Sequence, residues 1–199
     1  MTSARARFVI GATTMLLVVG CNKAASDRGS SNTTKTSSES TASAKDPIAN
    51  AESAAPAAIA HDAAIVVPGT NGSMKTLRAG KNGWTCMPDD PSTPANDPMC
   101  GDQNAMKWAS AWASHTPPPQ DQPGLAYMLQ GASDPSNTDP FATRPAPGAD
   151  WVRTGPHLMI LGSKAILAGY PSGPKPDTSG PYVMWAGTPY AHLMVPVVR

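Results

Sequence analysis

Charged side chains are scarce in this sequence. Only 15% of its 199 residues are Asp, Glu, Lys or Arg, and the formal net charge is +1. Lys and Arg form no stripe that could replace the counterions condensed on a nucleic acid. The near-neutral balance also provides no field that would steer a charged ligand. Nucleic acids and acidic polymers are therefore not expected as partners.

Several catalytic signatures are missing as well. The chain has no GxSxG elbow, no HExxH zinc motif and no Walker A loop. A hydrolase remains as an alternative, in which His157 or His192 acts as a general base oriented by Asp139 or Asp150. The sequence favours a non-enzymatic protein over this alternative.

No apolar run near the N-terminus is long enough to be a comfortable membrane span. The run Phe8 to Val19 follows a short basic start and leads into Gly20 and Cys21. This arrangement resembles a bacterial lipobox, so residues 1–20 are predicted to be a signal peptide. Acyl chains on Cys21 would then hold the protein on a membrane. An ordinary secretory signal or a small-residue signal anchor is the alternative.

The next segment, residues 21–60, has almost no large apolar side chains. Ser, Thr, Ala, Lys and Asn dominate it, so it cannot bury enough surface to offset its ordering entropy. We expect a disordered tether with a reach on the order of 35 Å. Asn22 replaces the Asp that commonly retains a lipoprotein at the inner membrane of Gram-negative cells. The predicted location is therefore the cell envelope, on the periplasmic side of the outer membrane if the cell is Gram-negative.

Two cysteines remain after Cys21. An exported protein folds under oxidising conditions, where the pair Cys86 and Cys100 is expected to form a disulfide. Closing a loop of this length contributes roughly 3 kcal/mol. A two-thiolate metal site is the alternative, but it lacks a second close pair or a His at zinc-finger spacing.

Residues 61–199 are predicted to form one small α+β domain, an antiparallel sheet with one main helix packed on it. The helix is expected to begin at Pro98, capped by Asp97, and to end near His115. The disulfide would then tie its first turn to a strand. Asn82 and Gly83 predict a hairpin between strands at 74–79 and 84–87. Further strands are expected at 64–67, 125–130, 151–153, 157–161, 182–186 and 190–197.

Two of these strands carry a His-x-Met pair, His157 with Met159 and His192 with Met194. Alternation places each pair on one side of its strand, with aliphatic residues opposite. If the strands are neighbours, imidazoles and thioethers gather on one surface. These groups suit Cu(I), and a copper site formed by the four residues is one hypothesis. The competing interpretation is that the helix covers this face and Met simply fills gaps in the core.

Two other ligands have weaker support. Haem with His and Met ligation is possible in principle, but no CxxCH motif provides covalent attachment. Asp134, Asn137 and Asp139 could gather on calcium, but their spacing lacks the Gly and distal Glu of an EF-hand loop. Turn chemistry explains these three residues better.

Several segments together resemble a group of uncharacterised exported bacterial proteins. The segments are NGWTCMPD (82–89), NDPMC (96–100), YMLQG (127–131), SNTDPFAT (136–143), GPHLMI (155–160) and GPYVMWAGTPYAHLMVPV (180–197). The resemblance begins near Leu77 and excludes the signal and the tether. It implies a single exported domain and assigns no ligand or catalytic residue. The sequence thus predicts a lipid-anchored exported protein that binds a protein or small ligand, with a copper protein or a hydrolase as alternatives.

Overall fold

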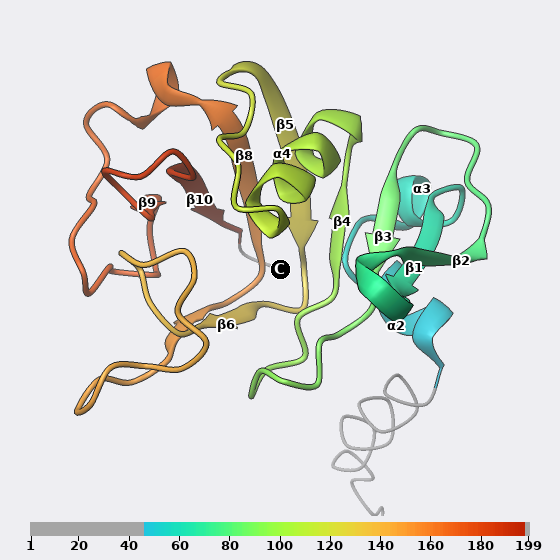
Figure 1. Ribbon diagram of the computed structural model, residues 1–199, viewed down its shortest axis with the longest axis horizontal. Coiled ribbons are helices and arrows are strands. Elements are labelled where there is room, and N and C mark those ends of the chain that lie inside the picture. The colour runs from blue at the N-terminus through green and yellow to red at the C-terminus, as the bar shows by residue number, and fades with distance from the viewer. Residues whose placement is uncertain (1–45, 198–199) are drawn as a thin grey trace, which may run out of the picture. The chain divides into compact units, whose positions relative to one another are not determined.

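The computed structural model describes residues 46–197, all within one compact unit. Its centre is an eight-stranded sheet with the strand order β2-β1-β3-β4-β5-β8-β10-β9 (Figure 1). Strands β1 and β3 run parallel, and every other neighbouring pair is antiparallel. The strands are β1 (Ala64–Pro68), β2 (Met74–Arg78), β3 (Thr85–Met87), β4 (Met99–Gly101), β5 (Asp121–Met128), β8 (His157–Ser163), β9 (Tyr182–Met184) and β10 (His192–Pro196).

The remaining elements are short apart from one helix. Strands β6 (Ala132–Asp134) and β7 (Val152–Thr154) form a separate antiparallel pair. The helices are α2 (Pro47–Glu52), α3 (Ala57–Ala60), α4 (Gln103–Ala113) and the 3-10 turns η1 (Thr70–Gly72) and η2 (Lys164–Leu167). The α+β class, the single main helix and the disulfide are confirmed. Between residues 46 and 197, no helix has the length and apolar character needed to cross a bilayer.

Helix α4 packs on one face of the sheet, over β5 and β8 (Figure 1). The approach is close because β5 carries glycine at the contact. A Cβ atom on Gly124 would lie 2.3 Å from the backbone nitrogen of Ala105. Across the contact, Ala105 and Trp108 are buried. A small residue on each element therefore allows the helix to rest directly on the strands.

The predicted start of this helix is wrong. Met99 to Gly101 form β4, and Asp102, rather than Asp97, caps α4 by accepting a hydrogen bond from the Ala105 N–H at 2.8 Å. The strand is favoured there because β4 pairs with both β3 and β5. The Cys86–Cys100 disulfide consequently joins paired positions of neighbouring strands, and does not tie the helix to a strand.

The opposite face carries a second cluster, formed by the disulfide and small side chains. Cys100 points away from α4, because its neighbour Gly101 lies against the side chain of Ala105. Alanines of α2, α3 and the segments that follow them pack beside the disulfide. The members of this cluster are Ala51, Ala54, Ala55, Ala60, Ala63, Ile65, Cys86 and Cys100.

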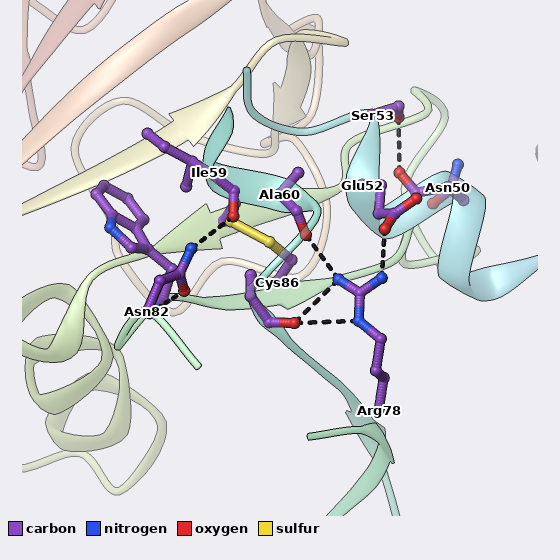
Figure 2. Close-up of a disulfide and its surroundings, with 11 residues drawn as sticks. Asn50, Glu52, Ser53, Ile59, Ala60, Arg78, Asn82 and Cys86 are labelled. Carbon is purple, nitrogen blue, oxygen red and sulfur yellow. Dashed lines mark hydrogen bonds and ion pairs between the residues drawn. A yellow bond between two sulfur atoms is a disulfide. The ribbon is translucent and has the colours of Figure 1, made fainter. Parts of the chain in front are cut away.

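The predicted tether therefore ends earlier than expected. Residues 46–60 belong to the folded unit, whereas residues 21–45 lie outside the described part. Arg78 fastens this region: its guanidinium pairs with Glu52 and donates to the carbonyl oxygens of Ala60 at 2.6 Å and Ala63 at 2.9 Å (Figure 2). Low apolar content misled the prediction because alanine, though small, packs well in a shallow layer beside a disulfide.

The predicted hairpin at Asn82-Gly83 is also wrong in its strand pairing. Gly83 does adopt a positive φ of 78°. However, β2 pairs with β1, and β1 lies between β2 and β3. The chain does bend at Gly83, but it leads from β2 to β3, and these two strands are not neighbours in the sheet.

Candidate functional site: the His/Met face

The two His-x-Met strands are neighbours in the sheet. Met159 of β8 pairs directly with Met194 of β10, and His157 pairs with Pro196. His192 pairs with Met184 of β9 instead. Since paired residues share a face, both histidines and both methionines point to the side covered by α4. We call this side the His/Met face.

The register separates the two histidines along the strands. Three residues separate His192 from Pro196, the partner of His157, so the two histidine positions are four residues apart along the strands. At about 3.4 Å per residue this corresponds to about 14 Å. The methionine pair occupies the centre, and one histidine flanks it at each end. This spacing is a separation of backbone positions, and the two imidazoles still interact, because His157 contributes to lowering the pKa of His192.

The whole face is buried. The exposed fractions are 0% for His157, 8% for Met159, 2% for His192 and 1% for Met194. Both methionines belong to the main core cluster, which also includes Ala105 and Trp108 of α4. The helix thus covers this face, as the competing interpretation expected.

His192 lies in an aromatic slot. Its ring meets those of Trp108 and Trp185 edge to face, with centroids 5.3 and 5.0 Å away. Its Nδ1 lies 2.9 Å from the carbonyl oxygen of Tyr190. Burial, partly opposed by this hydrogen bond, lowers the pKa of His192 to about 4. His192 is therefore neutral at physiological pH and shielded by indole rings.

Trp185 is held in place by a nearby loop. Its backbone N–H donates to the carbonyl of Asn137 at 2.8 Å and its indole N–H to that of Ser136 at 3.0 Å. The residue adopts a positive φ of 56°, which is uncommon for a side chain of this size. These hydrogen bonds compensate for that backbone conformation and keep the indole against His192.

His157 has a different environment, with one ring nitrogen unpaired. Its Nδ1 lies 2.7 Å from the carbonyl oxygen of Gly155, and a carbonyl only accepts, so Nδ1 carries the proton. The other nitrogen, Nε2, is buried without a hydrogen-bond partner among the described residues. Burial lowers the pKa of His157. The core thus contains a neutral imidazole that presents a free lone pair.

A third methionine lies beside His157 in the sheet, and it was not among the candidates predicted from the sequence. Met128 of β5 pairs directly with His157 and packs against the core cluster that contains Met159 and Met194. The alternation of side chains along residues 125–130 predicts which side of the strand Met128 occupies. It does not predict which strand lies beside this one. Only the pairing of β5 with β8 brings Met128 to the His/Met face.

The arrangement expected for the hydrolase alternative is not assembled. The described hydrogen bonds of His157 and His192 go to backbone carbonyls rather than to a carboxylate. Asp139 accepts a hydrogen bond from the Phe141 N–H at 2.9 Å, and Asp150 is exposed. Neither carboxylate orients an imidazole in this structure.

The residues considered for calcium serve as turn and loop anchors instead. Asn137 donates from Nδ2 to the carbonyl oxygens of Gly173 at 2.7 Å and Val183 at 3.3 Å. Asp134 lies in β6, apart from this turn. Within residues 46–197, no group of three or more His, Cys, Asp or Glu side chains is arranged to hold a metal. Methionine thioethers are a further class of metal ligand and are not among these side chains.

Two shallow depressions lie beside the first turns of α4, away from the His/Met face. Their volumes are about 540 and 270 Å³, and Gln103 lines both. The first is also lined by Thr85 and Lys107, and the second by Asn82 and Trp84. Neither contains a histidine or an aspartate pair that would suggest chemistry.

Comparisons with protein-family models, curated proteins and solved structures give no match to this chain.

Proposed function

We propose that this protein is an exported lipoprotein whose folded part binds a ligand at the His/Met face rather than catalysing a reaction. The observation that carries the proposal is the free Nε2 of His157, buried in the core without a hydrogen-bond partner among the described residues. The membrane would hold the protein through acyl chains on Cys21.

An unpaired polar nitrogen in a core has an energetic cost. Leaving such a group without a partner costs about 1–3 kcal/mol, and an apolar residue of similar shape would avoid this. Nδ1 of His157 already fixes the ring through Gly155, so the Nε2 lone pair is available and oriented. A neutral imidazole with one nitrogen bonded to a carbonyl is the form in which histidine binds metals.

The same environment disfavours general-base catalysis. Burial lowers the pKa of His157 and brings that of His192 to about 4. A general base works best when its pKa lies near the operating pH, and it must reach the proton that it removes. Two weakly basic, enclosed imidazoles are better suited to binding.

Export is supported by the disulfide between Cys86 and Cys100, because such bonds persist mainly in oxidising compartments. The outer membrane, with the protein on its periplasmic side, is the proposed location in a Gram-negative cell. Replacing Cys21 with Ser tests the anchor. The parent should partition with membranes and incorporate labelled palmitate, and Cys21→Ser should do neither. Equal partitioning of parent and variant would contradict the lipoprotein proposal.

The binding role is tested by following the His157 ring nitrogens by 15N NMR in the full chain in detergent. Nε2 should give the signal of an unprotonated, pyridine-type nitrogen at pH 8. A panel of Cu(I), Ag(I), Zn(II), Ni(II) and haem is then added to separate samples. At least one should shift the Nε2 signal while the Nδ1–H signal persists. If none does, the His/Met face is not a binding site.

A further inference from the structure

We propose that strands β5, β8 and β10 form a Cu(I) site from His157 and three methionines, Met128, Met159 and Met194. This inference rests on the binding role proposed above and names its ligand. It replaces His192, one of the four ligands suggested by the sequence, with Met128, which the sequence did not suggest.

The sheet register brings the four side chains into one compact patch. Met128 and His157 are directly paired across β5 and β8, and Met159 and Met194 are directly paired across β8 and β10. Directly paired residues have Cβ atoms about 4.5–5.5 Å apart, and diagonal neighbours about 7–8 Å. His157 thus has a methionine at a neighbouring position on each of the three strands.

The donor set matches a soft monovalent cation. Thioethers select Cu(I), and imidazole accommodates it. All four donors are uncharged, so binding would add a single positive charge to the core and no further charge. Zn(II) and Cu(II) would bring two charges and favour ligands such as carboxylate or thiolate. The two cysteines of the folded part cannot supply thiolates because they form the disulfide.

His192 does not complete this set. It lies about 14 Å along the strands from His157 by the spacing of the register. Its ring faces Trp108 and Trp185 edge-on at 5.3 and 5.0 Å. This packing supports a structural role for His192, in which its ring positions Trp108 and Trp185 over the His192 end of the His/Met face.

The Met128 corner is the most accessible part of the patch. Met128 is only partly buried, whereas His157 and Met194 are almost completely buried. Methionine has three rotatable side-chain bonds and tolerates rearrangement of its thioether. An ion could therefore be captured first by Met128 and passed to the enclosed donors.

The experiment uses the full chain in detergent, titrated with Cu(I) under anaerobic conditions against a chromogenic Cu(I) chelator. The parent should bind one equivalent, and X-ray absorption should show sulfur scatterers together with one nitrogen. Single variants Met128→Leu, Met159→Leu and Met194→Leu should each weaken binding about 10-fold or more. His157→Leu should lower the affinity further. His157→Leu removes the unpaired buried nitrogen together with the hydrogen bond to the Gly155 carbonyl, so urea unfolding of this variant is measured beside its affinity.

Met184→Leu is the matched control. Met184 lies on the same face and is buried to the same degree as Met194, but it pairs with His192 and lies outside the patch. Leucine for methionine nearly conserves volume, so both variants should fold. Met184→Leu should bind Cu(I) like the parent.

Several outcomes would overturn the inference, and they differ from failure of the general binding role. If Zn(II) or haem shifts the His157 Nε2 signal while Cu(I) does not, the binding role survives and the copper assignment fails. If His192→Asn abolishes Cu(I) binding and Met128→Leu does not, the set predicted from sequence is the correct one. If parent and all variants compete equally with the chelator, the bound copper lies elsewhere. If no ligand acts on His157, both proposals fail.

Discussion

Asp102 joins α4 to the sheet through a hydrogen bond from the backbone N–H of Leu125, at 3.0 Å. The other carboxylate oxygen caps the helix by accepting from Ala105 at 2.8 Å. One side chain therefore both starts the helix and fixes it on β5, directly above the His/Met face.

Replacing Asp102 with Ala should destabilise the fold by about 2.5–4 kcal/mol. Loss of an N-cap costs about 1 kcal/mol, and a hydrogen bond to a charged group contributes about 1.5–3 kcal/mol. Asp102→Asn retains an oxygen for one of the two donors, so it should cost less. Urea unfolding followed by far-UV circular dichroism measures both variants. Equal stability of Asp102→Ala and the parent would contradict the anchoring role.

Gly124→Ala should disrupt the seating of α4. The new Cβ would lie 2.3 Å from the Ala105 nitrogen and 2.7 Å from its Cα, which are backbone atoms that cannot rotate away. We expect a loss of about 2–3 kcal/mol and a change in the near-UV circular dichroism of Trp108. Gly155→Ala is the control, because a Cβ there meets nothing within 4 Å. Similar behaviour of the two variants would mean that the close helix contact is dispensable.

Asp134 should make the fold less stable as the pH rises from about 4 to about 7. Burial, with a smaller contribution from repulsion by Asp97, raises the pKa of Asp134 to about 7 from an ordinary 3.8. Across this window the folded chain keeps the proton and the unfolded chain has lost it. The contribution of Asp134 to the free energy of unfolding is therefore fully present below pH 4 and is lost by pH 7.

Asp134→Asn removes this dependence. The stability of the variant relative to the parent should increase from pH 4 to pH 7 and then level off, as measured by chemical denaturation at each pH. Asp150→Asn, at an exposed position, should show a constant difference from the parent. A constant difference for Asp134→Asn as well would show that Asp134 ionises normally.

Reducing the disulfide should lower the free energy of unfolding by roughly 3 kcal/mol. Cys86 and Cys100 are separated by 14 positions, and chain-entropy arguments give that value for a loop of this size. Unfolding in urea with and without a phosphine reductant measures the effect. The double variant Cys86→Ala/Cys100→Ala should be insensitive to the reductant. An unchanged midpoint for the reduced parent would show that the alanine layer of α2 and α3 suffices by itself.

The sequence predicted features that depend on short stretches of chain. The α+β class follows from alternating runs around one helical segment, and the disulfide was predicted from an even cysteine pair in a chain expected to be exported. Gly83 adopts a positive φ, which glycine in an asparagine-glycine pair tolerates locally. The two His-x-Met pairs were correctly placed on one side each, because alternation is a property of any extended backbone.

Errors arose where a local signal competed with a distant partner. Asp97-Pro98 has the form of a helix start, yet Met99 to Gly101 form a strand because β3 and β5 both pair with it. Asn82-Gly83 has the form of a hairpin, yet β1 takes the position beside β3. Residues 46–60 were expected to be disordered, yet their alanines pack in a layer beside the disulfide.

The composition of the His/Met face thus came from the sequence, and its geometry came from the fold. Alternation determined which side chains share a side of each strand. Register determined that Met159 faces Met194, that Met128 adjoins His157, and that His192 lies four positions farther along the strands among indoles. The physical reason is that the direction of a side chain is fixed by its own backbone, whereas strand pairing depends on contacts between residues far apart in the chain.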